Sequence, residues 1–484
     1  MLIFSDNWSR IFIMRNKVTA IVLCICFLFC TEGCAKREKS VDSESFSSET
    51  SALSSENANA AVSETSSSAS DERNAESDKN IADKSNSSVA KNSNTKKVSS
   101  GSSTKSTSAS SVNGKKPKSS FFKGIWVSCF EMSFKGLDAK GCSNKINSMF
   151  AKLAKQGYTA VFCHVRPYAD AYYPSKYFPY SRYLTGTEGV NPGYDPLYLM
   201  INAAHSNNME FHAWINPYRV STSTSDPSKL SANNIAAKWL TDSSNRAIAY
   251  NGGIYFNPAS TDVQKLVING VREILQNYKV DGIHFDDYFY PTVSQDFDKK
   301  SYSDYCKSVR GTPMNLGDWR RANVNSLVSA VYNVCRQYKK TFGISPSAHI
   351  SKNHTDRNYN EAYADIALWM REKGYVDYII PQLYFSYDYP NKNYCYDTFL
   401  NLWCSMPKHS GLKLYIGLGA YKLGDKSLKD SAAWCNETGN LLARQASGAK
   451  KNGTDGIVVF SYSSSVKDDP LNVKSITNMF KAIG

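Results

Sequence analysis

Residues 197–216 read LYLMINAAHSNNMEFHAWIN, and this segment contains the two patterns that decide the fold. Up to Asn207 the apolar residues recur at the three- and four-residue spacing of a helix that buries one face. From Glu210 to Asn216 two sets of side chains alternate, as they do in a strand. A helix that leads into a strand after so short a turn is one unit of an alternating α/β fold.

The same two patterns recur from residue 121 to residue 484. Strands are expected at residues 124–130, 159–166, 210–216, 281–286, 341–345, 376–384, 413–418 and 456–461. Helices are expected at residues 145–156, 197–207, 263–278, 319–338, 363–372, 396–404, 431–450 and 473–482. Eight β-then-α units predict a closed (β/α)8 TIM barrel over residues 121–484, with residues 217–260 inserted as a flap over its mouth. A doubly wound open sheet is the alternative, but no glycine-rich phosphate turn follows the first strand.

The first 34 residues have the order of an export signal. Two basic residues precede the apolar run 18–29, and Gly33 and Cys34 follow it. The run is too short to cross a bilayer, so we expect cleavage near its end and lipidation of Cys34. Secretion without a lipid is the alternative, because the residues before Gly33 depart from the usual lipoprotein pattern. Whether Met1 or Met14 is the start stays open.

Residues 35–120 are dominated by serine and contain almost no large apolar residues. Such a segment cannot bury enough apolar surface to offset its chain entropy, so we expect a disordered linker. Signal and linker together predict a barrel anchored by lipid to the extracellular face of the bacterial cytoplasmic membrane, or else a secreted one.

Most of the net charge of +14 lies in the barrel, since residues 1–120 hold 16 basic and 13 acidic residues. A basic exported domain suits anionic surroundings such as an acidic polymer or a phospholipid surface, although a role in solubility explains the charge equally well. Export argues against nucleic acid as the partner.

The twelve cysteines indicate neither a disulfide scaffold nor a metal site. Four lie in the signal, and the other eight are scattered from Cys129 to Cys435 without a CxxC pair or a His–Cys cluster. Most of the eight are expected to be buried as small apolar residues, with one or two disulfides left open by export. We predict no metal and no other cofactor; sensitivity to EDTA would instead support a mononuclear metal hydrolase.

Alternate residues of each barrel strand face the interior, and the active site of such barrels lies at the C-terminal ends of the strands. Alternation predicts that four strands aim polar or aromatic side chains at one place: His164 and Arg166; His212, Trp214 and Asn216; His284 and Asp286; Gln382 and Tyr384. Each histidine alone is explained equally well as a hydrogen-bonded core residue. Polar residues at the last inward position of each strand would be costly to bury without a ligand, so we predict a binding site there.

The loops after these strands are rich in aromatic rings and hydrogen-bonding groups. They contribute further candidates for substrate binding: Asp170, Tyr172, Tyr218, Arg219, Asn257 and Tyr288. Aromatic faces stack on the C–H faces of sugars, while arginine and amide side chains bind hydroxyl groups. The loops therefore indicate a carbohydrate cleft at the barrel mouth.

Seven longer segments resemble one known family. They are VRPYADAYYPSKYFPYSRYLTGTEGVNPGYDPL from residue 165, MEFHAWINPYRV from 209, GIYFNPAS from 253, VDGIHFDDYFYP from 280, YIIPQLYFSY from 378, LYIGLGAYKLG from 414 and GIVVFSYSSS from 456. In this order they are similar to glycosyl-hydrolase-like family 10, a group of bacterial barrels. The resemblance implies a (β/α)8 glycoside hydrolase-like fold, an exported setting, and a cell-wall polysaccharide such as peptidoglycan glycan strands as the substrate class.

Glycoside hydrolysis ordinarily requires two carboxyl groups, one ionised and one protonated. Asp286 is the first candidate because alternation points it inward, and Asp287 is the second because the chain can turn at the strand end and present both. Glu131, just beyond the first strand, is the third. The fifth strand ends in SPSAHISKN from residue 345, which carries no carboxylate, so the partner of Asp286 stays open. A non-catalytic glycan-binding lipoprotein is the alternative function, and a structural wall-anchoring protein is a further one.

Overall fold

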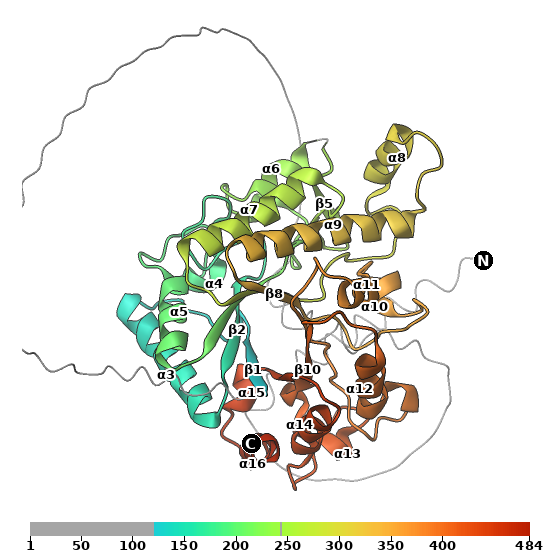
Figure 1. The fold of residues 1–484 in the computed structure, drawn as a ribbon. Helices are drawn as coiled ribbons and strands as arrows, with labels where there is room; N and C mark the ends of the chain where they lie inside the picture. The colour runs from blue at the N-terminus through green and yellow to red at the C-terminus, as the bar shows by residue number, and fades with distance from the viewer. Residues whose placement is uncertain (1–120, 243) are drawn as a thin grey trace, which may run out of the picture. The chain divides into compact units, whose positions relative to one another are not determined.

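The computed structural model describes residues 121–242 and 244–484, and it confirms the predicted closed barrel (Figure 1). Eight parallel strands follow one another around the barrel in chain order: β1 (Phe122–Val127), β2 (Ala160–Arg166), β3 (Glu210–Ile215), β7 (Gly282–Phe285), β8 (Thr341–Ile344), β9 (Tyr378–Ile379), β10 (Lys413–Gly419) and β11 (Gly456–Phe460). β1 pairs with both β2 and β11, so the sheet closes on itself. The predicted signal, linker and lipidated Cys34 lie outside the described residues.

Helices surround the strands (Figure 1). The main ones are α3 (Ala139–Gln156), α5 (Pro196–Ser206), α7 (Thr261–Asn277), α9 (Leu316–Gln337), α11 (Ile366–Arg371), α12 (Tyr396–Ser405), α14 (Leu441–Lys451) and α16 (Pro470–Ile483). The helix expected at residues 431–450 is two helices, α13 (Ser431–Trp434) and α14, because Gly439 has a φ of 63° between them. Among the described residues, we find no helix with the length and apolar character of a membrane span.

The insertion after β3 is a small antiparallel sheet. Its strands are β4 (Arg219–Ser221), β5 (Ala247–Tyr250) and β6 (Gly253–Phe256), in the order β4-β6-β5, with η1 (Pro227–Lys229) and α6 (Ile235–Thr241) between β4 and β5. Shorter helices elsewhere are α4 (Arg182–Thr185), α8 (Lys299–Ser308), α10 (Arg357–Asn360), η2 (Lys392–Tyr394), η3 (Ala420–Lys422) and α15 (Tyr462–Ser465). Because β4 starts soon after β3 ends, the small sheet begins at the C-terminal end of a barrel strand.

Large aromatic side chains fill the barrel. One buried cluster consists of Trp126, Ala160, Phe162, Trp214, Tyr378, Ile380, Tyr384 and Val458. Two glycines make room for its rings, since a Cβ on Gly343 would lie 2.1 Å from the ring of Tyr378 and a Cβ on Gly282 would lie 2.5 Å from Nδ1 of His212. The barrel interior is therefore a packed core, and a substrate has access only at the strand ends.

Two strands, β1 and β9, end at least three residues earlier than the sequence predicts. β1 ends at Val127 because the next residues turn, with the Met132 N–H donating to the Ser128 carbonyl. β9 has two residues because Pro381 has no N–H to donate to the ladder, and Gln382 returns to the sheet only as an isolated bridge. These early ends leave more of each loop free to line the mouth.

All eight cysteines of the described part are free thiols, and five of them are buried. The disulfides that the sequence left open are therefore not formed in this part of the chain. Burial raises the pKa of the Cys129 thiol to about 12, which is typical of an inert apolar cysteine.

Candidate active site

Asp286 directly follows β7 and turns toward the inward side chains of β3, as alternation predicts. Trp214 Nε1 donates to its Oδ2 at 3.0 Å, Asn216 Nδ2 donates to both oxygens at 3.1 and 3.2 Å, and the Tyr288 N–H donates to its Oδ1 at 3.2 Å. Only 3% of Asp286 is exposed. Asp286 is therefore a buried carboxylate in which each oxygen already accepts two hydrogen bonds from the protein.

Arg219 brings a positive charge to Asp286 and contacts the loops that follow β2, β3 and β7. Its guanidinium donates twice to the Pro167 carbonyl at 3.2 Å and lies over the rings of Tyr168 and Tyr288, with centroid distances of 4.8 and 4.9 Å. Its backbone N–H donates to Asn216 Oδ1 at 2.9 Å, which fixes the amide that holds Asp286. Arg219 thus positions the carboxylate of Asp286 in two ways, through its backbone contact with Asn216 and through its positive charge.

The adjacent carboxyl groups of Asp286 and Asp287 hold their protons differently. Burial raises the pKa of Asp286, but the charge of Arg219 and the hydrogen-bond donors oppose this rise. Burial and then the negative charge of Asp286 raise the pKa of Asp287 to about 7. The donors around both oxygens of Asp286 favour its ionised form, whereas Asp287, with a pKa of about 7, is half protonated at pH 7 and protonated below it.

Asp287 lies on the side of the mouth formed by the sixth barrel strand. Burial raises the pKa of Asp287 and the side-chain amide of Gln382 lowers it, while Gln382 Nε2 donates to the Ser345 carbonyl at 2.9 Å. Burial, and then the charges of Tyr421 and Asp287, raise the pKa of the Tyr384 hydroxyl well above its usual value. Asp287 is half-buried, so it is the more accessible member of the pair.

Arg166 points out of the barrel interior and donates to the carbonyl groups of Asn216 and Pro217, which corrects the prediction from alternation. His164 lies opposite Trp214 but Arg166 lies opposite Ile215, so β2 carries one extra residue at this place. Such a bulge turns the following side chain to the other face. The guanidinium of Arg166 lies 4.3 Å from the ring centroid of Phe178, outside the barrel interior, and its exposed fraction is 1%.

His212 and His284 are hydrogen-bonded core residues, one of the two interpretations that the sequence left open. His284 Nε2 accepts a hydrogen bond from Trp126 Nε1 at 3.2 Å, and His212 Nδ1 lies 3.0 Å from the Tyr378 hydroxyl. Burial lowers the pKa of His284 well below its usual value. In the part of the chain that the structure describes, no three His, Cys, Asp or Glu side chains gather as metal ligands do.

Glu131 connects the loops after the first and last strands. Its carboxylate accepts hydrogen bonds from the Ser128 N–H at 2.7 Å, the Ser461 hydroxyl at 2.5 Å and the Ser463 N–H at 2.6 Å. Within residues 121–242 and 244–484, no hydrogen bond or ion pair joins it to either aspartate. The carboxylate of Glu131 is therefore engaged with the loops after β1 and β11.

Four loop candidates are engaged in contacts within the protein. Asp170 accepts a hydrogen bond from the backbone of its own loop at 3.2 Å, and burial raises its pKa to about 6. Tyr172 donates to two carbonyl groups of the loop after β1. Asn257 is fully buried and donates to Asn245 and to a serine of α8, and Tyr218 is 1% exposed. These contacts account for Asp170, Tyr172 and Asn257 without a substrate, whereas the buried hydroxyl of Tyr218 has no hydrogen-bond partner among the described residues.

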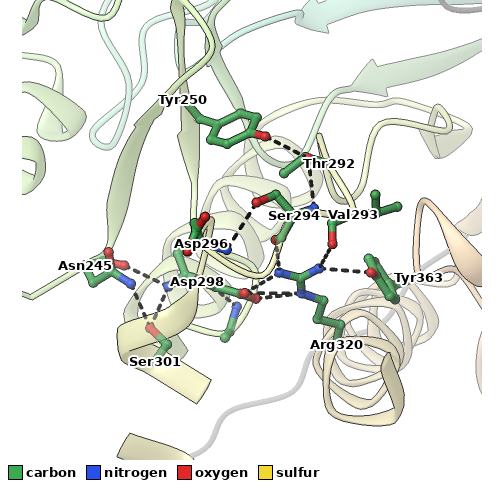
Figure 2. Close-up of polar contacts among 12 residues, drawn as sticks. Asn245, Tyr250, Thr292, Val293, Ser294, Asp296, Asp298, Ser301, Arg320 and Tyr363 are labelled. Atoms are coloured by element: carbon green, nitrogen blue, oxygen red, sulfur yellow. Dashed lines mark hydrogen bonds and ion pairs between the residues drawn. The ribbon is translucent and has the colours of Figure 1, made fainter. Parts of the chain in front are cut away.

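A buried ion pair anchors the loop that follows the carboxyl pair (Figure 2). Arg320 of α9 donates to Asp298 through Nε at 3.0 and 3.2 Å and through Nη2 at 2.5 Å, and both side chains are 0% exposed. The same guanidinium donates to the Tyr363 hydroxyl at 2.9 Å and to the Ser294 carbonyl at 2.7 Å. This pair could not be predicted, since nothing in the sequence distinguishes Arg320 from the half-buried Arg321 that follows it.

The fold and the site define a class: a (β/α)8 barrel with two adjacent carboxyl groups at the C-terminal end of its fourth strand. The family described as glycosyl hydrolase-like 10 matches residues 122–436, and the chain belongs to this family. The resemblance noted in the sequence is thereby confirmed.

Two relatives share about a third of their aligned residues with this chain. "Glycosyl hydrolase YngK" of Bacillus subtilis (strain 168) is 37% identical over 312 residues, which cover 60% of this chain and 58% of YngK. "Glycosyl hydrolase DigH" of Escherichia coli (strain K12) is 33% identical over 299 residues, which cover 57% of this chain and 65% of DigH. The match thus spans less than two thirds of either relative. Among solved structures, α-L-fucosidase isoenzyme 2 of Paenibacillus thiaminolyticus aligns with a TM-score of 0.48 at 14% identity, over 75% of this chain and 49% of that protein.

Proposed function

We propose that this chain is a glycoside hydrolase in which Asp287 is the general acid and Asp286 is the ionised carboxylate that keeps Asp287 protonated. The observation that carries the proposal is the split between the two groups: Asp286 accepts hydrogen bonds at both oxygens, while the pKa of Asp287 is raised to about 7. Environments that push two carboxyl pKa values apart are typical of glycosidases. Family membership supports the same activity.

In the proposed reaction Asp287 gives its proton to the glycosidic oxygen as the bond from that oxygen to C1 breaks. The negative charge of Asp286 stabilises the positive charge that develops on the sugar ring. Water then supplies the new oxygen on C1, and its proton returns to Asp287. Asp286 acts through its charge, because its lone pairs are occupied by Trp214, Asn216 and Tyr288.

We propose a cell-wall polysaccharide, with peptidoglycan glycan strands as the first candidate, as the substrate. The aromatic loops at the mouth and the basic charge of the barrel support a large glycan in anionic surroundings. We further propose that the protein is exported and held at the membrane by lipid on Cys34, with secretion as the alternative. Both proposals rest on sequence patterns.

Incubation of the protein with purified peptidoglycan glycan strands, stripped of stem peptides or not, tests the activity. We expect new reducing ends to appear with time and to require Asp287. If glycan binds to the protein and no reducing ends appear, the proposed hydrolase activity is wrong.

A glycan-binding protein without activity is the second candidate function. The observation that favours it is that both oxygens of Asp286 already accept hydrogen bonds from the protein, which leaves one accessible carboxyl group in the pair. It predicts glycan binding that is equally strong in Asp287→Asn and in the unchanged protein, with no turnover in either.

The pH profile of hydrolysis should fall on its alkaline side with a midpoint near 7. A general acid works only while protonated, and the pKa of Asp287 is raised to about 7, so its active form is lost as pH rises through that value. Rates of reducing-end release from pH 4 to 9 would show this limb. A rate that stays level up to pH 9 would contradict the assignment of Asp287.

An inhibitor of lipoprotein signal peptidase should increase the mass of the mature protein in growing cells. Cleavage before Cys34 requires that peptidase only if the cysteine is lipidated. Mass spectrometry of the protein from treated and untreated cells would show the difference, and an unchanged mass would favour secretion.

A further inference from the structure

His164 is held in one tautomer by the backbone. Its Nδ1 accepts a hydrogen bond from the Cys129 N–H at 3.2 Å, so Nδ1 carries no proton. Burial lowers the pKa of His164 well below its usual value, which keeps the ring neutral. The single ring proton therefore sits on Nε2, and that atom is a hydrogen-bond donor.

This donor has no protein acceptor. His164 is 3% exposed, and its Nε2 has no hydrogen-bond partner among the described residues. The ring stacks on Trp214 with a centroid distance of 3.3 Å and an interplanar angle of 19°. Because the two rings are nearly parallel, the N–H lies in the plane of the imidazole and does not point at the indole face. A buried donor left unpaired destabilises the fold, so an acceptor supplied by a bound ligand is favoured at this place.

The bulge in β2 places this donor at the mouth. Since Arg166 turns outward, His164 is the last inward residue of its strand. Trp214, on which His164 stacks, donates to Asp286 at 3.0 Å. Trp214 thus contacts both the ring of His164 and the carboxylate of Asp286, so the ring lies one side chain away from Asp286.

We infer that the Nε2–H of His164 donates a hydrogen bond to an oxygen of the sugar bound beside Asp286 and Asp287, and that it selects for that oxygen. The inference rests on the proposed glycan cleft and assigns one contact within it. A neutral N–H requires an acceptor, which a hydroxyl or an acetamido carbonyl provides and a protonated amine does not. A site built around such a donor rejects sugars without the matching oxygen.

Two substitutions distinguish the roles of the two ring nitrogen atoms of His164. His164→Gln can place an amide N–H near the position of Nε2 but removes the acceptor for the Cys129 N–H. His164→Asn can keep an acceptor for that N–H but has nothing at the position of Nε2. If Nε2 binds the sugar, kcat/KM on peptide-free peptidoglycan glycan should fall roughly 10- to 100-fold in His164→Asn and much less in His164→Gln. If the histidine only holds the loop of Cys129, the order is reversed, and equal losses also overturn the inference.

Two further measurements keep the outcomes distinct. Thermal unfolding of both variants shows whether a loss of rate follows a loss of fold, and calorimetric binding of the same glycan gives the comparison even where no turnover occurs. If the unchanged protein neither binds nor cleaves glycan, the proposed function fails and not the contact alone.

Comparing N-acetylated with de-N-acetylated glycan identifies the oxygen: a preference lost in His164→Asn assigns the acetamido group, and a preference retained assigns a hydroxyl.

Discussion

Asp287→Asn is expected to lower kcat for glycan hydrolysis by roughly 10²- to 10⁴-fold, the contribution usual for a general acid. The substitution keeps the shape of the side chain and removes the proton that the leaving oxygen needs. The melting temperature should stay within a few degrees, because Asp287 is only half-buried and the amide keeps its size. Initial rates of reducing-end release, with thermal unfolding alongside, would measure both.

Asp296→Asn is the matched control, since this exposed acid lies on the same loop and should leave the rate unchanged. Asp286→Asn should behave differently from both. The new amide nitrogen would face N–H donors that now give hydrogen bonds to a carboxylate oxygen. We therefore expect Asp286→Asn to lower the free energy of unfolding by about 1–3 kcal/mol and also to lower the rate. If Asp287→Asn retains full activity, the roles assigned to the pair are wrong.

Asp298→Asn should lower the free energy of unfolding by about 3–5 kcal/mol, because it leaves the guanidinium of Arg320 buried without its counter-charge. The loop that follows the carboxyl pair should also become less ordered, since the same guanidinium donates to the Ser294 carbonyl of that loop (Figure 2). Denaturant unfolding followed by circular dichroism measures the stability.

The neighbouring pair of Arg321 and Asp318 provides the control, because Asp318 is 51% exposed. Asp318→Asn should cost less than about 1 kcal/mol. A combined replacement, Arg320→Met with Asp298→Leu, should recover part of the loss, since apolar groups of similar size remove the unpaired charge. If Asp298→Asn costs no more than Asp318→Asn, the buried pair does not anchor the loop.

The fold could be predicted because its signals are local. Each strand shows its alternation and each helix its spacing within about ten residues, and eight repeats of one order leave few topologies. The ends of the elements were less well predicted. The stop at Pro381 was visible in the sequence, whereas the turn after Val127 depends on a backbone hydrogen bond that no residue type signals.

The site was predicted in part, and the errors have one physical origin. Alternation located Trp214, Asn216 and Asp286 together because β3 and β7 are regular up to their ends. Alternation failed for Arg166, because a single extra residue in β2 exchanges the inward and outward positions that follow it. Nothing in the sequence indicates this extra residue. The contacts of Glu131 with Ser461 and of Asn257 with Ser301 of α8 could not be foreseen either, since these partners are distant in the chain.

The carboxylate of Asp286 is held by side chains that precede it by 70 and 72 residues, across the whole of the β4–β6 insertion and α7. Closing so long a segment costs entropy before any contact compensates for it, and contacts between distant residues form slowly during folding. On refolding from denaturant, helices are expected to return before β3 and β7 are paired. Recovery of enzymatic rate should therefore lag behind recovery of the far-ultraviolet signal, which makes the rate the stricter reporter of a completed barrel.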